Sequence, residues 1–280
     1  TNLRKAALRG TQSFEEIIRI LKAHRKQYDT HWILGRGWDQ NDWAGKSYPD
    51  KQTLDQAFPD QPVYLTRIDG HAAIVNSKAL EIAGVIRKTA IEGGKFLKKE
   101  GQLTGVLIDN AMSAVRRHIA QPDRQMTQSL LAKAAGNMHE VGITALSDAG
   151  LTRSQIALLD TLQQRDSINL RIDAWVADDS ASIAYFLDRG VYETDMLRVG
   201  TIKLFADGAL GSRGARLLKP YTDAPDHKGL WVTPESHLRN ICKKAYAHNF
   251  QVATHAIGDA ANRRMLKVYG EFLKPGNDRR

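Results

Sequence analysis

The amino-acid sequence predicts an α/β fold of the TIM-like (β/α) barrel type. From residue 125 onward, segments whose apolar residues have helical spacing alternate with short apolar segments rich in β-branched residues. Helical segments between strands imply parallel strand pairing. Three of the predicted strands end in residues that can bind a metal ion or move protons, and barrels of this type carry their reactive residues at the carboxyl ends of the strands.

In the first half of the chain, several segments have local signals of regular structure. Thr11 or Ser13 can cap a helix, and Asn76 can cap a second, short helix that Gly84 ends. Two apolar segments run into turn residues, as strands do. The expected elements are a helix at 11–27, a strand at 32–35, a strand at 62–68, a helix at 76–83 and a loop or hairpin at 87–103.

The second half alternates regularly between helix and strand. The expected order is helix 125–141, strand 143–147, helix 154–165, strand 170–176, helix 180–189, strand 200–206, helix 234–249 and strand 251–256. No repeat of fixed period, low-complexity tract or Pro/Gly linker divides the chain. We therefore predict one domain over residues 1–280, the central part of a barrel, with an insertion around residues 31–105.

The composition is that of a globular protein with a basic surface. Hydrophobic residues make up 42% of the 280 residues, and a formal charge of +9 arises from 40 Lys and Arg against 31 Asp and Glu. The basic residues form small groups with acidic residues nearby, and no zinc-finger, homeodomain or RNA-recognition motif is present. A solvated surface is therefore favoured over nucleic-acid binding, which would show steeply salt-dependent retention on DNA.

The sequence leaves the cellular compartment open. No unbroken run of about 18 apolar residues indicates a membrane helix, and no basic-then-apolar leader is present. The chain opens on Thr1 rather than Met, which suggests a segment excised from a longer protein. The location is then cytoplasmic or, if a leader was removed, periplasmic, and the single Cys242 excludes only an internal disulfide framework.

The predicted strand ends carry Asp148, the segment from Lys203 to Asp207, and His255. A lysine in a barrel strand is costly to bury. Either Lys203 pairs with a carboxylate, such as Asp207 or Asp148, and holds the barrel together, or desolvation lowers its pKa so that the free amine reacts with carbon dioxide or acts as a base. The residues alone favour the first alternative, and they favour a packed structural role for His255 over metal ligation.

Several common catalytic motifs are absent. The glycine-rich segment 207–216 lacks the Gly-Lys-Ser/Thr ending of a P-loop and the G-x-G-x-x-G order of a dinucleotide site. Its two arginines make it a candidate loop for an anionic substrate group. Neither a G-x-S-x-G elbow nor H-E-x-x-H occurs, and Cys242 lies within a predicted helix.

Five segments, in order along nearly the whole chain, carry a more specific signal: Gly37-Trp38-Asp39, Arg67 to Leu80, Gly142-Ile143-Thr144, Ile202 to Arg213 and His255 to Asn262. Together they resemble the amidohydrolase superfamily, in its branch of amidohydrolase-3 or YtcJ-like metal-dependent hydrolases. The resemblance implies a barrel of the metal-dependent hydrolase type. It also implies one or two divalent metal ions, expected to be zinc, that activate a water to attack an amide-like carbon-nitrogen bond.

The resemblance assigns roles residue by residue. Lys203 matches the lysine expected to be a carbamylated metal bridge, and His255 matches a metal-binding histidine at the end of a later strand. Further motif positions match residues with substrate-side or structural roles. The substrate-binding candidates are His71, Asp207, Arg213 and Asp259.

The sequence departs from the family pattern at both ends of the metal site. Such enzymes begin the site with His-x-His, but none of the nine histidines here lies two positions from another. They complete it with a further His and a proton-shuttle Asp, whereas this chain stops at Arg280. We therefore predict an incomplete barrel, a central fragment that binds its metal incompletely and whose catalytic proton-shuttle residue lies outside it.

Two functions follow as alternatives. The full-length protein is expected to be a metal-dependent hydrolase of non-peptide carbon-nitrogen bonds, in which Lys203 and His255 supply ligands, although activity is not assured for the 280-residue piece alone. The alternative is a catalytically inactive, barrel-derived binding or regulatory protein. The expected partner is a small-molecule substrate, without nucleic acid or membrane, and homo-oligomerisation stays open.

Overall fold

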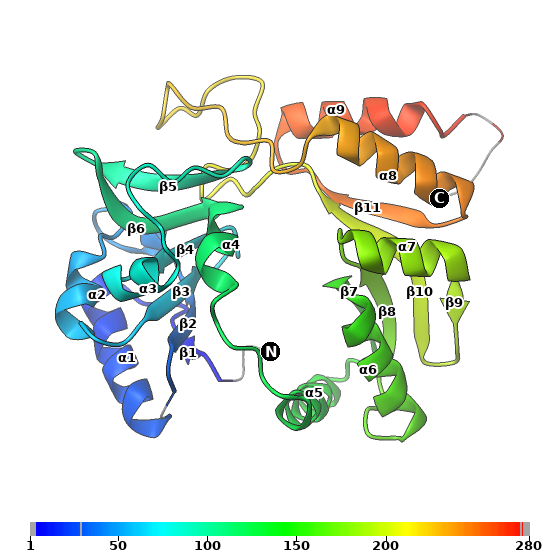
Figure 1. The fold of residues 1–280 in the computed structure, drawn as a ribbon, viewed down its shortest axis with the longest axis horizontal. Coiled ribbons are helices and arrows are strands. Elements are labelled where there is room, and N and C mark those ends of the chain that lie inside the picture. The colour runs from blue at the N-terminus through cyan, green and yellow to red at the C-terminus, as the bar shows by residue number, and fades with distance from the viewer. Residues whose placement is uncertain (1–3, 29, 275, 277–280) are drawn as a thin grey trace. The chain divides into compact units, whose positions relative to one another are not determined.

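The computed structural model describes residues 4–28, 30–274 and 276, which form two compact units (Figure 1). One of them, called here the mixed-sheet unit, comprises residues 2–121 and 207–232. The other, the parallel-sheet unit, comprises residues 122–206 and 233–280. Thr1 and Arg280, the two ends of the single domain predicted from the sequence, lie outside the described residues.

The mixed-sheet unit is built on a six-stranded sheet in the order β1-β2-β3-β4-β6-β5. β1 and β3 pair with β2 in parallel, and the other neighbours pair antiparallel. The strands are β1 (Ala6–Ala7), β2 (Ile33–Trp38), β3 (Val63–Arg67), β4 (Ala72–Val75), β5 (Gly94–Lys99) and β6 (Gln102–Asp109). The helices are α1 (Phe14–Gln27), α2 (Gln52–Ala57), α3 (Ser77–Ile82) and α4 (Ala111–Arg116), with a short 3-10 helix at Gln40–Asp42.

Both faces of this mixed sheet carry a buried hydrophobic cluster, because the side chains of a strand point alternately to its two faces. In β3, Leu65 belongs to a hydrophobic cluster that includes Ile17 of α1. Its neighbour Tyr64 belongs to a second cluster, which includes Val115 of α4. Helices therefore cover both faces of the sheet, and this explains why β3 and β4 are buried throughout instead of alternating between buried and exposed residues.

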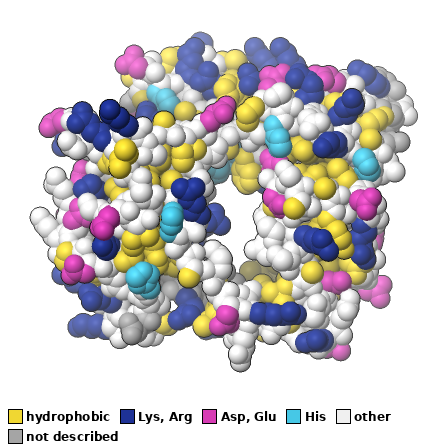
Figure 2. Space-filling view, in the orientation of Figure 1, with side chains coloured by type: hydrophobic (Ala, Val, Ile, Leu, Met, Phe, Trp, Pro, Cys, Tyr) yellow, Lys and Arg dark blue, Asp and Glu magenta, His cyan; other side chains and the backbone are white. Residues whose placement is uncertain are grey.

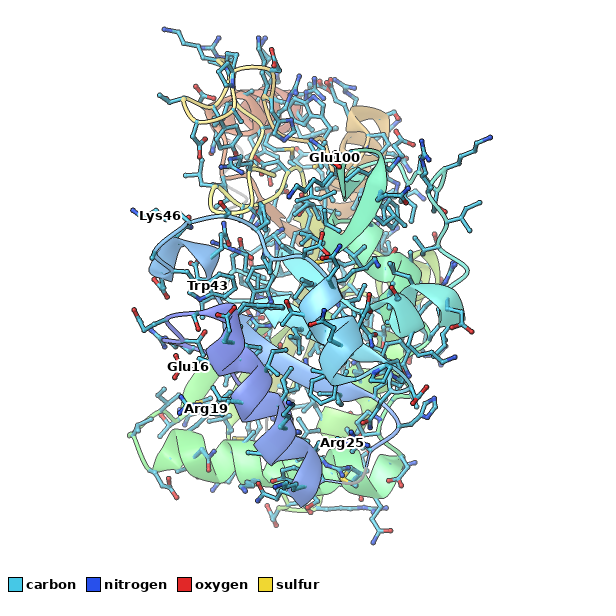
Figure 3. All side chains as sticks on the ribbon, turned by 90° about the vertical axis from the view of Figure 1, so that its left-hand side faces the viewer. Glu16, Arg19, Arg25, Trp43, Lys46 and Glu100 are labelled. Carbon is cyan, nitrogen blue, oxygen red and sulfur yellow. The ribbon has the colours of Figure 1, made fainter. Side chains whose placement is uncertain are left out.

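Helix α1 illustrates how local sequence sets the bounds of an element. The side chain of Ser13 accepts a hydrogen bond from the backbone N–H of Glu16 and so caps the helix. Glu16 and Arg19 form an exposed ion pair one turn apart, and Figure 3 labels both on the helix with Arg25 further along it. Apolar residues such as Ile17 lie on the buried face of the same helix.

The parallel-sheet unit contains four main strands in the order β11-β10-β8-β7, and every pairing along that order is parallel. They are β7 (Ala145–Leu151), β8 (Arg171–Val176), β10 (Leu197–Phe205) and β11 (Gln251–His255); the short β9 (Tyr192–Glu193) pairs antiparallel with β10. The helices are α5 (Arg124–His139), α6 (Arg153–Gln164), α7 (Ser180–Arg189), α8 (Glu235–Ala247) and α9 (Asp259–Gly270). Consecutive strands are thus joined through helices, as in βαβ units.

The two faces of the parallel sheet differ in burial. Ile202 and Leu204 of β10 are buried, and the register places Ile202 beside the equally buried Val176 of β8. Lys203 and Phe205 alternate with them and therefore point to the other face, where Phe205 keeps 37% of its surface exposed. The face that carries Lys203 is the more open one, and we call it the open face.

The predicted α/β class and the parallel pairing of the second half are confirmed. The predicted polar segment 87–103 contributes to a hairpin between β5 and β6. The sequence did not predict β4, because only a few residues separate the turn at Asp69-Gly70 from the helix cap at Asn76. Neither sheet of the described residues closes into a barrel, so the incomplete barrel and the insertion around residues 31–105 stay predictions.

The distribution of charged side chains and the hydropathy of the helices bear on the partners expected from the sequence. Figure 2 shows Lys and Arg side chains spread over the visible face, with Asp and Glu among them. In the part of the chain that the structure describes, no helix has both the length and the apolar character needed to cross a membrane.

Candidate functional site

Lys203 and His255 lie on adjacent parallel strands and on the same face of the sheet. Lys203 pairs in register with Ala253, and Phe205 pairs with His255. Paired residues of a ladder share a face, and every second residue of a strand returns to it. The structure therefore brings the two predicted metal ligands together on the open face of the parallel-sheet unit.

The ring of Phe205 lies close to both predicted ligands. Its centroid is 3.8 Å from Nζ of Lys203 and 5.6 Å from the ring centroid of His255. Nζ of Lys203 also donates a hydrogen bond to the carbonyl oxygen of Leu204 at 2.8 Å. The lysine amine is thus held against an aromatic face and a carbonyl group.

The predicted carboxylate partner of Lys203 is not observed. Among the described residues, the Nζ of Lys203 forms no ion pair with Asp207 or Asp148. Burial lowers the pKa of Lys203 to about 8, because desolvation disfavours the charged ammonium form. Part of the amine is therefore unprotonated at mildly alkaline pH, and the unprotonated amine is the form that can react with carbon dioxide.

Lys203 and His255 match part of the coordination shell of a metal ion. No group of three or more His, Cys, Asp or Glu side chains that could hold a metal ion occurs among residues 4–28, 30–274 and 276. His255 can supply an imidazole nitrogen, and Lys203 can supply carboxylate-type oxygens once its amine has gained carbon dioxide. The two residues fit as ligands of a divalent metal.

Asp148 does not lie where the sequence places it. It was expected to follow a strand, but it lies within β7, because the strand continues to Leu151, which pairs with Val176 of β8. Asp148 itself pairs with Ala174. Ala174 and Val176 are both buried and lie two residues apart, so they point to the same face of β8. The register therefore directs Asp148 away from the open face that carries Lys203.

Asp259 begins a helix. It is the first residue of α9, it is exposed, and its Oδ1 accepts a hydrogen bond from the backbone N–H of Ala260 at 2.8 Å. A carboxylate at this end of a helix is favoured by the helix dipole. The structure thus gives Asp259 a local stabilising role, and its substrate role stays a prediction.

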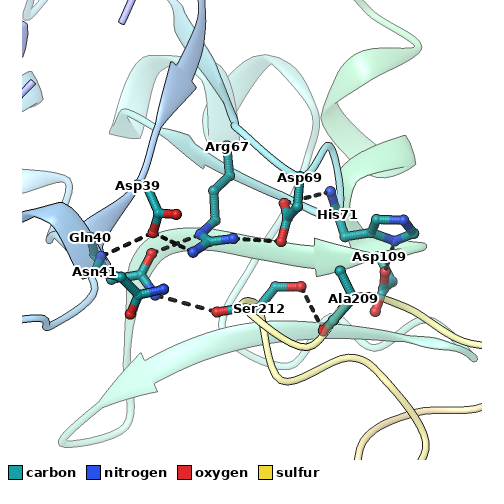
Figure 4. A network of polar contacts seen from close by, with 10 residues as sticks. Asp39, Gln40, Asn41, Arg67, Asp69, His71, Asp109, Ala209 and Ser212 are labelled. Atoms are coloured by element: carbon teal, nitrogen blue, oxygen red, sulfur yellow. Dashed lines mark hydrogen bonds and ion pairs between the residues drawn. The ribbon is translucent and has the colours of Figure 1, made fainter. Parts of the chain in front are cut away.

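In the mixed-sheet unit, the buried residue Arg67 organises a polar cluster at the end of β3 (Figure 4). Its Nε donates to Oε1 of Gln40 at 2.8 Å, and its Nη1 donates to Oδ2 of Asp69 at 2.6 Å. Its Nη2 donates to Oδ1 of Asp39. The guanidinium of Arg67, a residue that is 1% exposed, is thereby compensated by two carboxylates and an amide.

Asp69 connects this cluster to His71. Its Oδ1 accepts from the backbone N–H of His71 at 2.9 Å, across Gly70, whose φ of +80° suits glycine. On the other side, Nδ1 of His71 lies 2.8 Å from Oδ1 of Asp109. The side chains of His71 and Asp109 are 17% and 1% exposed. His71 is therefore fixed at its backbone and at its ring by two different carboxylates.

The glycine-rich segment 207–216 belongs to the same unit. Asp207 is fully buried, and its Oδ2 accepts from the backbone N–H of Arg216 at 2.7 Å, which closes the loop. Arg213 forms an ion pair of 2.8 Å with the exposed Asp223. Asp207 therefore anchors the loop, whereas Arg213 keeps a partly exposed guanidinium that suits an anionic group.

Sequence reasoning missed Asp109, the partner of His71, and did not assign a role to Arg67. Arg67 stood inside a family motif, but a buried arginine cannot be distinguished from an exposed one by sequence. A signal for Asp109 was present, because the apolar run Val106 to Ile108 ends in this carboxylate. The same signal, a carboxylate after an apolar run, had been used for Asp148.

The sequence matches the model of the amidohydrolase family over residues 1–278. The chain therefore belongs to the amidohydrolase family. The parallel βαβ arrangement, with Lys203 and His255 on one face of adjacent strands, is consistent with this membership.

Several relatives extend this result. The chain is 32% identical over 294 residues to Protein LONG AFTER FAR-RED 3 of Arabidopsis thaliana, covering 98% of this chain and 50% of that protein. It is 31% identical over 282 residues to the putative amidohydrolase YtcJ of Bacillus subtilis strain 168, covering 97% and 52%. It is 22% identical over 279 residues to the N-substituted formamide deformylase of Arthrobacter pascens, covering 95% and 51%. The chain spans about half the length of the curated relatives it matches.

The fold also resembles that of solved structures of metal-dependent hydrolases. The chain resembles the crystal structure of an uncharacterized metal-dependent hydrolase from Pyrococcus horikoshii, with a TM-score of 0.66 and 27% sequence identity. The similarity covers 96% of this chain and 53% of that chain. The fold is therefore consistent with that of the amidohydrolase family.

Proposed function

We propose that this chain is part of a metal-dependent hydrolase that cleaves amide-like, non-peptide carbon-nitrogen bonds with a metal-activated water. The observation that carries the proposal is the placement of Lys203 and His255 on one open face of adjacent parallel strands. Family membership supports hydrolysis in general, and the formamide deformylase among the relatives supports a carbon-nitrogen bond as the target. The same membership favours a hydrolase over a catalytically inactive binding protein.

Lys203 and His255 are the residues that would hold the metal, for which we propose one or two zinc ions. When bound, the metal supplies a water of lowered pKa and polarises the substrate carbonyl. Because the chain spans about half the length of the curated relatives it matches, we propose that residues outside it supply the remaining ligands and the proton shuttle.

The surroundings of Lys203 suit carbamate formation. The neutral Nζ would form a bond to the carbon of carbon dioxide, and the proton that the nitrogen loses would pass to solvent. Burial favours the neutral amine, as the lowered pKa of about 8 indicates. The product carries one negative charge on two oxygens, which suits a divalent metal better than an amine does.

On the substrate side we propose contacts by His71, Arg213 and Asp259. His71 offers an oriented ring, and Arg213 offers a guanidinium held by a single exposed carboxylate. Asp207 would act through the loop that it anchors rather than by direct contact, because it is fully buried and bound to the backbone of Arg216. The substrate is thus expected to be a small amide with an anionic group.

Metal content and hydrolysis together test the proposal. Zinc would be measured by elemental analysis in the 280-residue chain and in the longer protein that contains it, with formate release from N-formyl amines measured in parallel. We expect stoichiometric zinc and hydrolysis in the longer protein, and far less zinc in the 280-residue chain. Lys203→Ala and His255→Ala should each remove metal and activity from the longer protein.

The control is His248→Ala. His248 follows α8, is exposed, and its Nδ1 contacts the carbonyl oxygen of Lys244, so its loss should leave the metal content unchanged. Tight stoichiometric zinc that survives both Lys203→Ala and His255→Ala would contradict the assigned ligands. Zinc-loaded longer protein that hydrolyses no amide would favour the inactive binding protein instead.

A further inference from the structure

Helices cover both faces of the mixed sheet, but one face stays open at the corner formed by β1 and β2, here called the β1–β2 corner. Ala6 and Leu8 are buried in the hydrophobic cluster to which α1 contributes, whereas Ala7, between them, is exposed on the other face. The register pairs Ala7 with Arg36 of β2, so these two residues share that face. Lys5 is half-buried and lies two residues before Ala7, so alternation directs it to the same face.

Helix α4 brings a third basic side chain to this face. Leu34 of β2 pairs with Tyr64 of β3, and Leu34 shares the face of Arg36, two residues further along the strand. Tyr64 belongs to the hydrophobic cluster that includes Val115 of α4. The next residue of that helix, Arg116, lies in its last turn and is exposed. The helix and the two edge strands thus present basic residues to one face of the sheet.

The charges of Lys5, Arg36 and Arg116, here called the basic cluster, act on one another. Burial lowers the pKa of Lys5, and the charges of Arg36 and Arg116 lower it further, because a nearby positive charge disfavours the ammonium form. Burial raises the pKa of the Tyr64 hydroxyl, and the charge of Arg116 opposes that rise. The three positive charges therefore lie within electrostatic range of one another, with Tyr64 in range of Arg116.

The basic cluster has no acidic partner in the part of the chain that the structure describes. Within residues 4–28, 30–274 and 276, none of its three side chains forms an ion pair or a hydrogen bond. The hydroxyl of Tyr64 is buried and also lacks a hydrogen-bond partner. The guanidinium of Arg67, by contrast, contacts two carboxylates and an amide. The β1–β2 corner thus presents donors without an acceptor, as expected where a ligand supplies one.

The charge of the basic cluster suits a phosphate group. Unpaired like charges repel one another and lower the stability of the folded chain, and a bound anion removes that cost. A carboxylate brings one negative charge, whereas a phosphate monoester brings about 1.5 to 2 at pH 7 together with three acceptor oxygens. The planar guanidinium of arginine matches a phosphate through two parallel hydrogen bonds. Two arginines and a lysine can therefore neutralise and orient one such group.

We propose that Lys5, Arg36 and Arg116 bind a phosphate group, either free or carried by a small molecule, at the β1–β2 corner. Arg36 and Arg116 donate hydrogen bonds to the phosphate oxygens, and Lys5 adds a third positive charge from the more buried side. All three residues belong to the mixed-sheet unit, so the site is independent of the proposed metal site at Lys203 and His255.

Calorimetric titration of the 280-residue chain tests the site. Inorganic phosphate and glycerol 3-phosphate are titrated separately, at constant ionic strength and with a chelator present so that neither binds through a metal ion. We expect saturable binding of one phosphate group per chain. Arg36→Gln, Arg116→Gln and Lys5→Gln should each weaken binding about tenfold or more, because each removes a charge-assisted contact.

The matched control is Arg25→Gln. Arg25 is an exposed residue of α1, which packs against the other face of the mixed sheet, so this change alters the net charge equally and should leave phosphate binding unchanged. Without phosphate, the three cluster variants should be at least as stable toward urea as the wild type, because each relieves repulsion between like charges. Phosphate should then raise the urea midpoint of the wild type and of Arg25→Gln, and much less that of the cluster variants.

The two probes distinguish the sources of the phosphate group. Tighter binding of glycerol 3-phosphate indicates an ester as the ligand and equal binding indicates the free ion, and either result supports the site. The absence of saturable binding, or equal weakening by Arg25→Gln and Arg36→Gln, would overturn it. Binding that is lost in the longer protein would also overturn it, since residues outside this chain would then pair with the basic cluster. A DNA duplex that binds far more tightly than both probes would replace the small ligand with nucleic acid.

Discussion

At the residue scale, Arg67 illustrates how one buried charge depends on its neighbours. Its guanidinium contacts Asp39, Asp69 and Gln40, and only 1% of the residue is exposed. Removing one member of such a group leaves the others desolvated and unpaired, at a cost of about 3 kcal/mol or more. We expect Arg67→Met to lower the free energy of unfolding by about that amount, measured by urea denaturation.

The control for Arg67 is Arg19→Met. Arg19 forms an exposed ion pair with Glu16 on α1, and such pairs contribute about 0.5 kcal/mol or less. Arg67→Lys should recover only part of the loss, because a single ammonium cannot reproduce the fork that binds two carboxylates. If Arg67→Met and Arg19→Met lowered the free energy of unfolding equally, the buried cluster would contribute no more stability than an exposed ion pair.

The site could be predicted from sequence only in part, and the reason is visible in single residues. Lys203 and His255 follow from strand ends and motif positions, and the structure does place them on one face. Strand alternation also predicts Phe205 on the same face as Lys203, but no local pattern reveals that the Phe205 ring lies beside His255 as well. The contact of His71 with Asp109 spans 38 residues and depends on a strand register that no local pattern encodes.

At the scale of elements, the loop 207–216 packs against the end of β6 at two positions that only glycine can occupy, Gly208 and Gly214. Gly208 does not have a positive φ, so a side chain there is excluded by contact with Asp109 and not by backbone conformation. We expect Gly208→Ala to destabilise the protein by about 1–3 kcal/mol, as overpacking does. It should also shift the NMR signals of the imidazole nitrogens of His71, because the added methyl group displaces the carboxylate of Asp109 that contacts this ring.

Gly136→Ala is the matched control for this loop. Gly136 lies inside α5 and has no atom near the position of an added Cβ, and alanine is favoured over glycine in a helix by about 0.5–1 kcal/mol. This variant should therefore be more stable and leave His71 unchanged. If Gly208→Ala were equally stabilising, the inference that the carboxylate of Asp109 excludes a side chain at Gly208 would be contradicted.

Elements with local signals were predictable, whereas elements defined by pairing were not. The caps at Ser13 and Asn76 are observed as expected, because a cap is a contact within one turn of chain. β4 has only four residues and owes its extension to β3 and β6 on either side. Asp148 was misplaced for the same reason, since pairing with β8 extends β7 beyond it.

At the scale of the whole molecule, the two units have separate sheets and separate cores. Both faces of the mixed sheet are covered by the helices of its own unit, as the clusters around Leu65 and Tyr64 show. The parallel sheet buries Ile202 and Leu204 on one face. Units that bury their own apolar surfaces open with different free energies. We therefore expect the 280-residue chain to unfold in two steps rather than in one.

The distribution of tryptophan makes this prediction measurable. Four of the five tryptophans lie in the mixed-sheet unit, and Trp175 lies in the parallel-sheet unit. Fluorescence of Trp175→Phe would then follow only the mixed-sheet unit, while far-UV circular dichroism would mainly follow the long helices α5 to α9 of the parallel-sheet unit. Because the open face of that unit leaves Lys203 and Phe205 only partly covered, its transition should come at the lower urea concentration. Coincident transitions by the two probes would mean that the chain unfolds as one cooperative body.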